Sequence, residues 1–322
     1  MKPLIRGIHH AGISVPDLDK AVSYYENATG FKEVTRYRID NDPVADAVTG
    51  ESGLSAEVAL VRAPNAYLEL TQFDGMSETF SEMPVIGPGM THICFQSPAS
   101  NPAFPRFEAA GMRLINTTGK PVDLGGYGIV YTYARDPFGN IFELEHFDDP
   151  LRTESMWVGH VALVTADIDR LVDFYTSLMG YGPKARGDFS GSPRLDEVVG
   201  HDDLVTRAAW FKTGNQLLEL WQFVNPETPQ PGLARPYQRH GYNKFTFEVS
   251  DAQAFAEQLK ELGAELISEP TPWRDALVFH ARDPEGNRFE VLQWQNADAR
   301  FSVEPMRWDE DEARAAIAAN QG

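Results

Sequence analysis

The chain has little cysteine and no long apolar run. Cys94 is the only cysteine among 322 residues, which excludes an intrachain disulfide and a zinc site built from cysteines. No apolar run approaches the roughly 18 residues that a membrane span needs, and the first residues lack the apolar core of a signal peptide. We therefore expect a cytoplasmic protein in a reducing setting.

Basic residues are also scarce relative to acidic ones. There are 28 Lys and Arg against 47 Asp and Glu, which gives a net charge of −19. Such a charge favours solubility and opposes binding to polyanions and anionic membranes. We expect a small-molecule substrate and neither a nucleic-acid nor a membrane partner. The chain could also form a homodimer.

The chain does contain one unit that recurs four times. The stretch from Ile8 to Asp17 opens the first copy, and each later copy opens with a similar strand. The unit reads strand, helix, strand, strand, strand. In the first copy Asp17 is a natural N-cap and Gly30 ends the helix. From His10 to His160 is 150 positions, and from Glu69 to Glu219 is also 150, a spacing that indicates an internal repeat.

The repeat predicts an α+β fold. We expect four β-α-β-β-β modules that pair into two cup-shaped, partly closed mixed sheets with helices outside. The expected domains are an N-terminal two-module domain with an intact metal site, a C-terminal two-module domain with a degenerate site, and a tail with a short helix at about Trp308 to Ala319. Their ranges are 1–150, 151–296 and 297–322.

Strand parity places one ligand-type side chain and one carboxylate of each module on the face opposite the packed one. In the first half these residues are His10, Glu69, His92 and Glu143. Two imidazoles and two carboxylates suit one divalent metal ion, namely Zn, Ni, Co, Mn or Fe. Four protein ligands around an octahedral metal leave two positions for water or substrate. Tyr133 and His280 occupy matching positions before the two Asp-Pro turns. Each is a candidate hydrogen-bonding neighbour of the ligand-type residues or plain packing, and we favour packing for His280.

This arrangement resembles the vicinal oxygen chelate superfamily, which includes glyoxalase I, methylmalonyl-CoA epimerase, extradiol dioxygenases and the bleomycin resistance proteins. The resemblance covers nearly the whole chain. Its motifs are the six-residue spacing between His10 and Asp17, the aromatic pairs Tyr24-Tyr25 and Phe174-Tyr175, and both Asp-Pro-x-Gly-Asn turns. It implies paired modules forming a cup around a metal, held by the positions of His10, Glu69, His92 and Glu143.

The second half departs from this pattern, because Lys244 stands where the second histidine would be. A charged lysine is not a metal ligand. His160, Glu219 and Glu290 remain around it. We interpret this set as a degenerate site held by an internal salt bridge, with a structural role.

Two pairings of the modules give a complete ligand set. Pairing module one with two gathers His10, Glu69, His92 and Glu143. Pairing module two with three gathers His92, Glu143, His160 and Glu219. We favour the first pairing because sequential elements are usually neighbours and need only a short linker.

Three functions follow from the resemblance. The first is a metal-dependent isomerase, epimerase or lyase of the glyoxalase type, which acts on vicinal oxygens through a metal-stabilised enediolate with Glu69 or Glu143 moving the proton. The second is an Fe(II) extradiol dioxygenase using His10, His92 and Glu143, although the sequence lacks the histidine that begins that signature.

The third is a non-enzymatic binder of a drug or metabolite. Such a binder would use aromatic side chains to line a cup, and the candidates are Tyr127, Tyr131, Tyr133, Trp210, Trp221 and Trp273. At strand spacing such residues are more often core. The polar insertions at 40–55 and 187–204 are expected to be lids over the cups or plain surface loops.

Overall fold

The computed structural model describes residues 4–76, 82–125, 129–147, 152, 154–230, 236–296 and 299–307. Tyr127 and the expected helix at 308–319 lie outside these residues. Within them, no helix is both long and apolar enough to cross a membrane.

The four expected modules are present in the expected order. The first comprises β1 (Ile5–Ser14), α1 (Leu18–Thr29), β2 (Lys32–Asp40), α2 (Pro43–Thr49), β3 (Ser55–Arg62) and β4 (Tyr67–Phe73). The second comprises β5 (Gly89–Ser97), α3 (Phe104–Ala109), β6 (Arg113–Leu114), β7 (Val122–Asp123), β8 (Val130–Arg135) and β9 (Ile141–His146).

The second half repeats this plan. The third module comprises β10 (Trp157–Val164), α4 (Ile168–Met179), β11 (Ala185–Ser190), α5 (Pro193–Val199), β12 (Val205–Lys212) and β13 (Leu217–Asn225). The fourth comprises β14 (Gly241–Val249), α6 (Ala252–Glu261), β15 (Glu265–Leu266), β16 (Thr271–Trp273), β17 (Ala276–Arg282) and β18 (Arg288–Trp294), and a 3₁₀ turn follows at Glu304–Met306.

Local signals in the sequence explain the long helices. Asp17 caps α1 through its side chain, and Gly30 ends that helix in the left-handed conformation. Asp167 and Gly180 do the same for α4. An N-cap carboxylate satisfies a free backbone N–H at the first turn, and glycine adopts a positive φ without strain.

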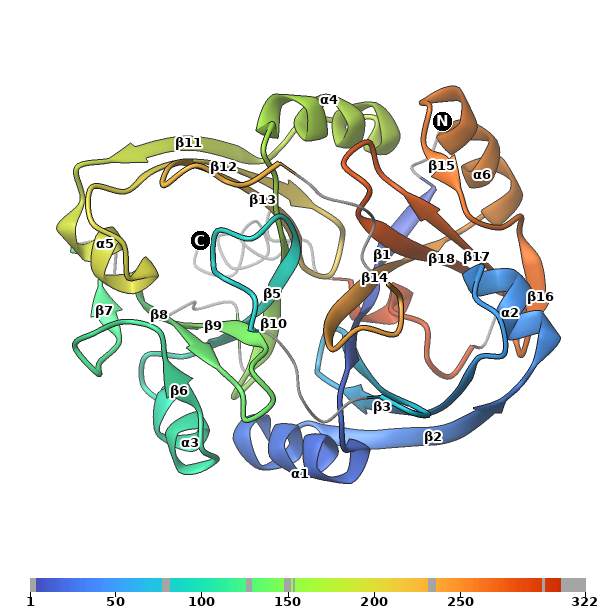
Figure 1. Cartoon of the computed structure of the whole chain (residues 1–322), viewed down its shortest axis with the longest axis horizontal. Coiled ribbons are helices and arrows are strands. Elements are labelled where there is room, and N and C mark those ends of the chain that lie inside the picture. Colours follow the sequence, from blue (N-terminus) through green and yellow to red (C-terminus); the bar gives the residue numbers. More distant parts are fainter. Residues whose placement is uncertain are drawn as a thin grey trace, which may run out of the picture.

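The modules pair differently from the favoured expectation. Sheet A has the strand order β15-β17-β18-β14-β1-β4-β3-β2, and sheet B the order β11-β12-β13-β10-β5-β9-β8-β6. Module one therefore pairs with module four, and module two with module three. Figure 1 shows the two sheets as separate curved cups that lie side by side. Neither cup belongs to 1–150 or to 151–296 alone, so the expected domain boundary does not separate the sheets.

The two sheets share one apolar core. It contains residues of β1, β5, β10 and β14 and of the helices between the sheets, such as Ile13, Phe95, Tyr175 and Phe245. In Figure 1, α1 and α4 lie between the two cups at opposite edges of the molecule. The modules of each half are thus joined through their helices, while their strands belong to different sheets.

Two buried asparagines lock the sheets together. The side chain of Asn65, in the turn between β3 and β4, bonds to both backbone groups of Val158 in β10. The side chain of Asn215, in the turn between β12 and β13, bonds to both backbone groups of Ile8 in β1. Each asparagine also donates to the other's backbone carbonyl. Each sheet therefore supplies a polar contact that the other requires, because buried backbone groups need partners.

The polar insertions contain regular structure that the sequence pattern did not indicate. The insertion at 40–55 holds α2, and the insertion at 187–204 holds the end of β11 and all of α5. Each helix packs across its cup onto the opposite module: α2 lies against β16 and β17, and α5 against β7 and β8. Figure 1 places α5 and α2 on the outer sides of the two cups.

Candidate metal centre

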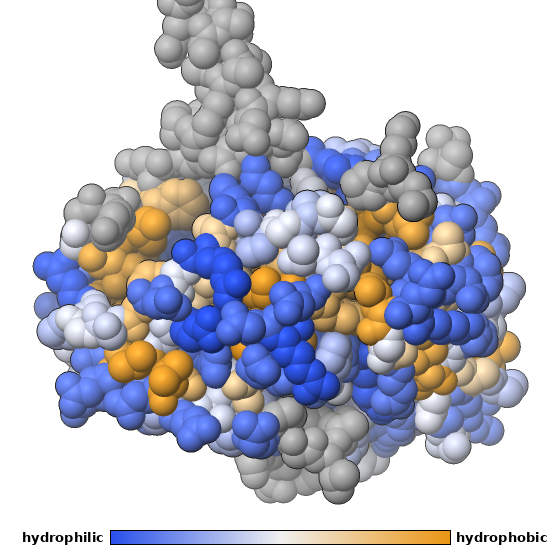
Figure 2. Space-filling view, turned by 90° about the horizontal axis from the view of Figure 1, so that it is seen from above, coloured by the Kyte–Doolittle hydropathy of each residue, from blue (hydrophilic) through white to orange (hydrophobic). Residues whose placement is uncertain are grey.

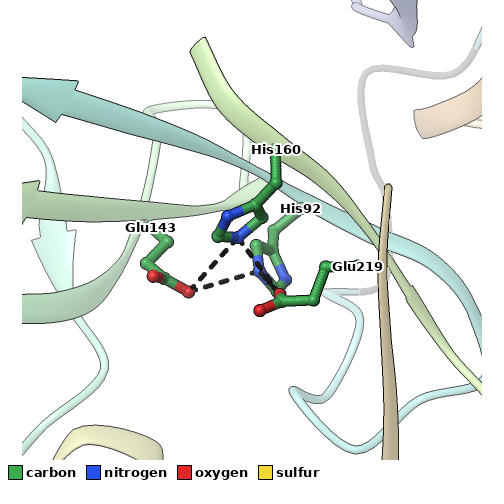
Figure 3. A group of neighbouring side chains, drawn as sticks. All are labelled: His92, Glu143, His160 and Glu219. Carbon is green, nitrogen blue, oxygen red and sulfur yellow. Dashed lines mark ion pairs between the residues drawn. The ribbon is translucent and has the colours of Figure 1, made fainter. Parts of the chain in front are cut away.

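The cup of sheet B gathers four side chains that suit a metal ion. His92, Glu143, His160 and Glu219 each offer a ligand atom within 4.8 Å of the others, and all four residues are buried. They come from β5, β9, β10 and β13, the four central strands. Figure 3 shows their side chains pointing toward one another.

The register of the strands explains this convergence. His92 on β5 and Glu219 on β13 both lie beside Ala162 of β10. His160 on β10 and Glu143 on β9 both lie beside Cys94 of β5. Because side chains alternate across a strand, all four ligand-type residues stand on one face.

The distances fit a shared cation. The Nε2 atom of His160 lies 3.1 Å from Glu219 and 3.8 Å from Glu143. The Nε2 atom of His92 lies 3.3 Å from Glu143 and 3.5 Å from Glu219. Ligand atoms held about 2.1 Å from one metal ion are separated by roughly 3 to 3.5 Å.

The bonding of these atoms also fits a cation. Among the described residues, the Nε2 atoms of His92 and His160 and the Oε2 atom of Glu219 are buried without a hydrogen-bond partner. Buried polar atoms in native proteins are nearly always satisfied. Three buried atoms that can bind a metal and have no hydrogen-bond partner therefore make this a group that could hold a divalent metal.

The electrostatics of the site are those of tightly coupled ion pairs. Burial alone would lower the pKa of His92 and His160, but the ion pairs with Glu143 and Glu219 raise both. Burial alone would raise the pKa of Glu143, yet the two histidines lower it to about 2. The same histidines lower the pKa of Glu219. The ion pairs therefore stabilise the charged form of the imidazoles and the charged form of the carboxylates.

Other aromatic side chains surround the four residues. Trp210 donates from Nε1 to Oε1 of Glu219 over 2.5 Å. The ring of Tyr133 stands edge-on to that of His92, with centroids 5.0 Å apart. Burial raises the pKa of Tyr133, and so does the charge of Glu143. Tyr133 thus lies beside His92, and nothing in the sequence distinguished Trp210 as a partner of Glu219.

The structure corrects the favoured four-residue set. His10 and Glu69 lie in sheet A and do not reach His92 and Glu143, because β1 pairs with β14 and β4. The alternative set from pairing modules two and three is the one brought together. The three-residue dioxygenase site of His10, His92 and Glu143 is divided between the sheets for the same reason.

The aromatic candidates are also divided between the sheets. Tyr131, Tyr133, Trp210 and Trp221 belong to strands of sheet B, and Trp273 belongs to sheet A. Trp210 and Trp221 contact each other with ring centroids 6.2 Å apart.

The fold and the site define a class of protein in which paired β-α-β-β-β modules form cups around a His/Glu group. The profile of the Glyoxalase/Bleomycin resistance protein/Dioxygenase superfamily matches residues 7–144 and 157–291. The chain belongs to this superfamily.

Curated relatives correspond to about half of the chain. A lactoylglutathione lyase of Neisseria meningitidis is 24% identical over 141 residues, which are 43% of this chain and 91% of the relative. An ethylmalonyl-CoA/methylmalonyl-CoA epimerase of Cereibacter sphaeroides is 24% identical over 144 residues, which are 44% of this chain and 98% of the relative.

Solved structures share the fold over most of the chain. Glyoxalase I from Zea mays has a TM-score of 0.62 at 20% identity and covers 89% of this chain and 92% of its own. A putative dioxygenase from Bacillus subtilis has a TM-score of 0.58 at 14% identity. The match covers 98% of this chain and 96% of the dioxygenase chain.

Proposed function

We propose that the chain is a metal-dependent isomerase, epimerase or lyase of the glyoxalase type, with its site in sheet B. The observation that carries this proposal is the convergence of two unsatisfied imidazole nitrogens and two carboxylates at one buried point. The ligand set would be His92, Glu143, His160 and Glu219. Zn, Ni, Co, Mn and Fe all accept this set of nitrogen and oxygen donors.

The reaction requires a Lewis acid and a group that moves a proton. When bound, a divalent metal polarises a substrate oxygen and lowers the energy of negative charge that develops next to a carbonyl. Glu143 and Glu219 approach the centre from β9 and β13, the strands on either side of the central pair β5 and β10. Either carboxylate would take or return a proton at the substrate carbon.

The surroundings of Glu219 favour a defined orientation. Trp210 donates to Oε1 of Glu219, while Oε2 of Glu219 faces the two histidines. Glu219 therefore keeps one oxygen fixed, while the other is directed at the centre. Such fixed partners hold a reacting group in a productive position.

The composition of the site favours this reaction over iron-dependent ring cleavage. Fe(II) oxygenases of this type use two histidines and one carboxylate and leave the remaining positions open. Here a second carboxylate, Glu219, lies as close to the histidines as Glu143 does.

An aromatic wall beside the site supports a substrate with an apolar part. Trp221 stands on the same face of β13 as Glu219, two residues away. The rings of Phe189 and Trp221 lie 6.0 Å apart, and Phe189 is 37% exposed. Apolar walls with a few converging polar groups are typical of small-molecule sites.

Proton exchange tests the proposal. The metal-loaded chain is incubated in deuterium oxide with α-hydroxy- and α-keto-carbonyl compounds, including S-lactoylglutathione, and with methylmalonyl-CoA. We expect deuterium to enter at the carbon next to the carbonyl of at least one compound, and we expect His92→Ala to abolish it. Glu143→Gln and Glu219→Gln, examined separately, identify which carboxylate moves the proton. A metal-loaded chain that exchanges no compound of this class would contradict the proposal.

A further inference from the structure

The cup of sheet A contains a buried lysine between two carboxylates. The Nζ atom of Lys244 lies 2.6 Å from Glu290 and 3.0 Å from Glu69, and the residue is 2% exposed. Burial alone would lower the pKa of Lys244, but Glu290 and Glu69 raise it well above its usual value. Contacts of 2.6 and 3.0 Å to two carboxylates are those of an ammonium ion.

Lys244 occupies the position that His92 has in sheet B. Lys244 and Glu69 both lie beside Gly12 of β1, as His92 and Glu219 both lie beside Ala162 of β10. The strand registers of the two cups are the same at this point. The long side chain of Lys244 thus starts where a histidine ligand starts in the other cup.

The remaining pair of sheet A also corresponds to sheet B. His10 of β1 and Glu290 of β18 lie beside Thr246 of β14, as His160 and Glu143 lie beside Cys94. The Nε2 atom of His10 is 3.3 Å from Glu69 and 3.7 Å from Glu290. Three of the four ligand positions are therefore present in both cups.

The two cups differ in whether these atoms are satisfied. In sheet A the Oγ1 atom of Thr246 lies 2.9 Å from Nε2 of His10 and donates to Glu290. His280 lies 3.1 Å from Glu290 as well, and is thus part of the ion cluster, whereas the sequence suggested plain packing. In sheet B the corresponding Nε2 atom, on His160, has no hydrogen-bond partner. The Nε2 atom of His10 is therefore within hydrogen-bond distance of a hydroxyl group, whereas the Nε2 atoms of His92 and His160 have no hydrogen bond.

The residue of β1 beside Lys244 is a glycine. A Cβ atom on Gly12 would lie 2.4 Å from Oδ1 of Asn243, and 2.9 Å from Cγ and 3.2 Å from Cε of Lys244. Sheet B, which has the shorter histidine, accommodates Ala162 at the matching position. The side chains of Asn243 and Lys244 therefore both occupy the space that a Cβ atom at position 12 would need.

Aromatic rings also fill the cup of sheet A. Tyr37 of β2 lies under the guanidinium group of Arg274, which is 3.5 Å from the ring centroid. The residue 150 positions later, in sheet B, is Gly187. Tyr237 stands edge-on to His280 with centroids 5.5 Å apart. The space above the ion cluster is thus occupied by side chains of the protein.

We infer that the ammonium group of Lys244 takes the place of a divalent cation in sheet A, so that this cup is a metal site occupied by the protein itself. Lys244 supplies one positive charge between two carboxylates, and Nε2 of His10 is within hydrogen-bond distance of Thr246. The cluster therefore has no position left for a metal ion. The inference concerns sheet A and rests on the proposed function only in taking sheet B as the site that binds metal. It predicts that removing the lysine restores a second metal site.

Metal uptake by substituted chains tests this inference. All variants carry His92→Ala, which removes a ligand from sheet B, so that added Ni²⁺ reports on sheet A. One variant adds Lys244→His, and another adds Lys244→His with Thr246→Cys, which copies the residues of sheet B. The control adds Lys260→His, because Lys260 also lies 3.1 Å from two glutamates but on the surface. Metal per chain is measured after dialysis, and the melting temperature is measured with and without Ni²⁺.

We expect about one tightly held Ni²⁺ per chain, and a higher melting temperature with Ni²⁺, in at least one Lys244 variant. We expect neither effect in the His92→Ala parent or in the Lys260 control. The inference is overturned if neither Lys244 variant takes up metal, or if the parent already binds a metal that is lost on Glu69→Gln. The proposed function fails separately, if the unsubstituted chain exchanges no substrate proton.

Discussion

At the scale of single residues, the partners of the four site residues decide how firmly a metal would be held. Trp210 donates its indole N–H to Glu219, whereas the buried indole N–H of the neighbouring Trp221 has no partner. Of these two tryptophans on adjacent strands, only Trp210 therefore holds the carboxylate of Glu219 by a hydrogen bond.

Replacing Trp210 by phenylalanine keeps a ring but removes this donor. We predict that Trp210→Phe weakens metal binding by about 10- to 100-fold, because Glu219 loses the bond that orients it. The matched control is Trp221→Phe, which should leave affinity unchanged. Competition with a chelator of known affinity measures both constants. Equal effects of the two substitutions would show that the hydrogen bond from Trp210 does not orient Glu219 for metal binding.

The raised pKa values of His92 and His160 predict proton release on metal binding. In the metal-free chain the imidazoles stay protonated above their ordinary pKa because Glu143 and Glu219 stabilise the charged form. A histidine must be neutral to bind a metal, so metal affinity should fall as the pH falls. Calorimetry at pH 7 in two buffers of different ionisation enthalpy measures the protons released. A binding enthalpy that does not depend on the buffer would contradict the assigned protonation.

At the scale of elements, turns in two modules are tied to helices in two others. The hydroxyl of Tyr25 in α1 donates to Asp136 in the turn before β9, over 2.9 Å. Tyr175 in α4 donates to Asp283 before β18 over 3.0 Å. Both aspartates are buried, and burial raises the pKa of each to about 6. These bonds connect sheet A to sheet B within each half of the chain.

Neighbouring tyrosines in α1 allow a controlled test of this tie. Tyr25→Phe leaves a buried carboxylate with one donor fewer, and we predict a loss of about 1 to 3 kcal/mol in the free energy of unfolding. Tyr24→Phe removes a buried hydroxyl that has no partner and should be neutral or slightly stabilising. Urea unfolding of both variants provides the values. A Tyr25→Phe chain as stable as the Tyr24→Phe chain would show that the tie contributes little.

The elements that the sequence predicted well are those fixed by local chemistry. The caps at Asp17 and Asp167 and the glycine stops at Gly30 and Gly180 depend on a few neighbouring residues, and the structure confirms them. The helix at 43–49 was not predicted, because its seven residues are too few for a clear period and its stability comes from packing on β16 and β17.

At the scale of the whole molecule, module pairing was the feature that sequence reasoning placed wrongly. The alternation of side chains along a strand correctly predicted that the ligand-type residues of each module lie on one face. It contains no information on which modules share a sheet. The preference for short linkers failed because α1 and α4 connect the modules of each half through the core. The asparagines at 65 and 215 are 150 positions apart, so the sequence marks them as equivalent positions of the repeat but does not show that they connect the sheets.

These asparagines predict that the two sheets unfold together. Asn215→Ala leaves the backbone N–H of Ile8 without its partner, and we predict a loss of about 2 to 4 kcal/mol in the free energy of unfolding. Asn27→Ala, on the exposed face of α1, should change stability by less than about 0.5 kcal/mol. Tryptophan fluorescence and circular dichroism should report a single transition. Two separate transitions would show that the sheets are independent.

The most direct measurement is the metal content of the chain purified without chelator, compared with that of His160→Ala and His10→Ala. The two histidines occupy matching positions in β10 and β1, so the variants differ in which cup loses its imidazole. We predict about one metal per chain in the unsubstituted protein and in His10→Ala, and none in His160→Ala. Loss of the metal in His10→Ala, or its retention in His160→Ala, would contradict the assignment of the site to sheet B.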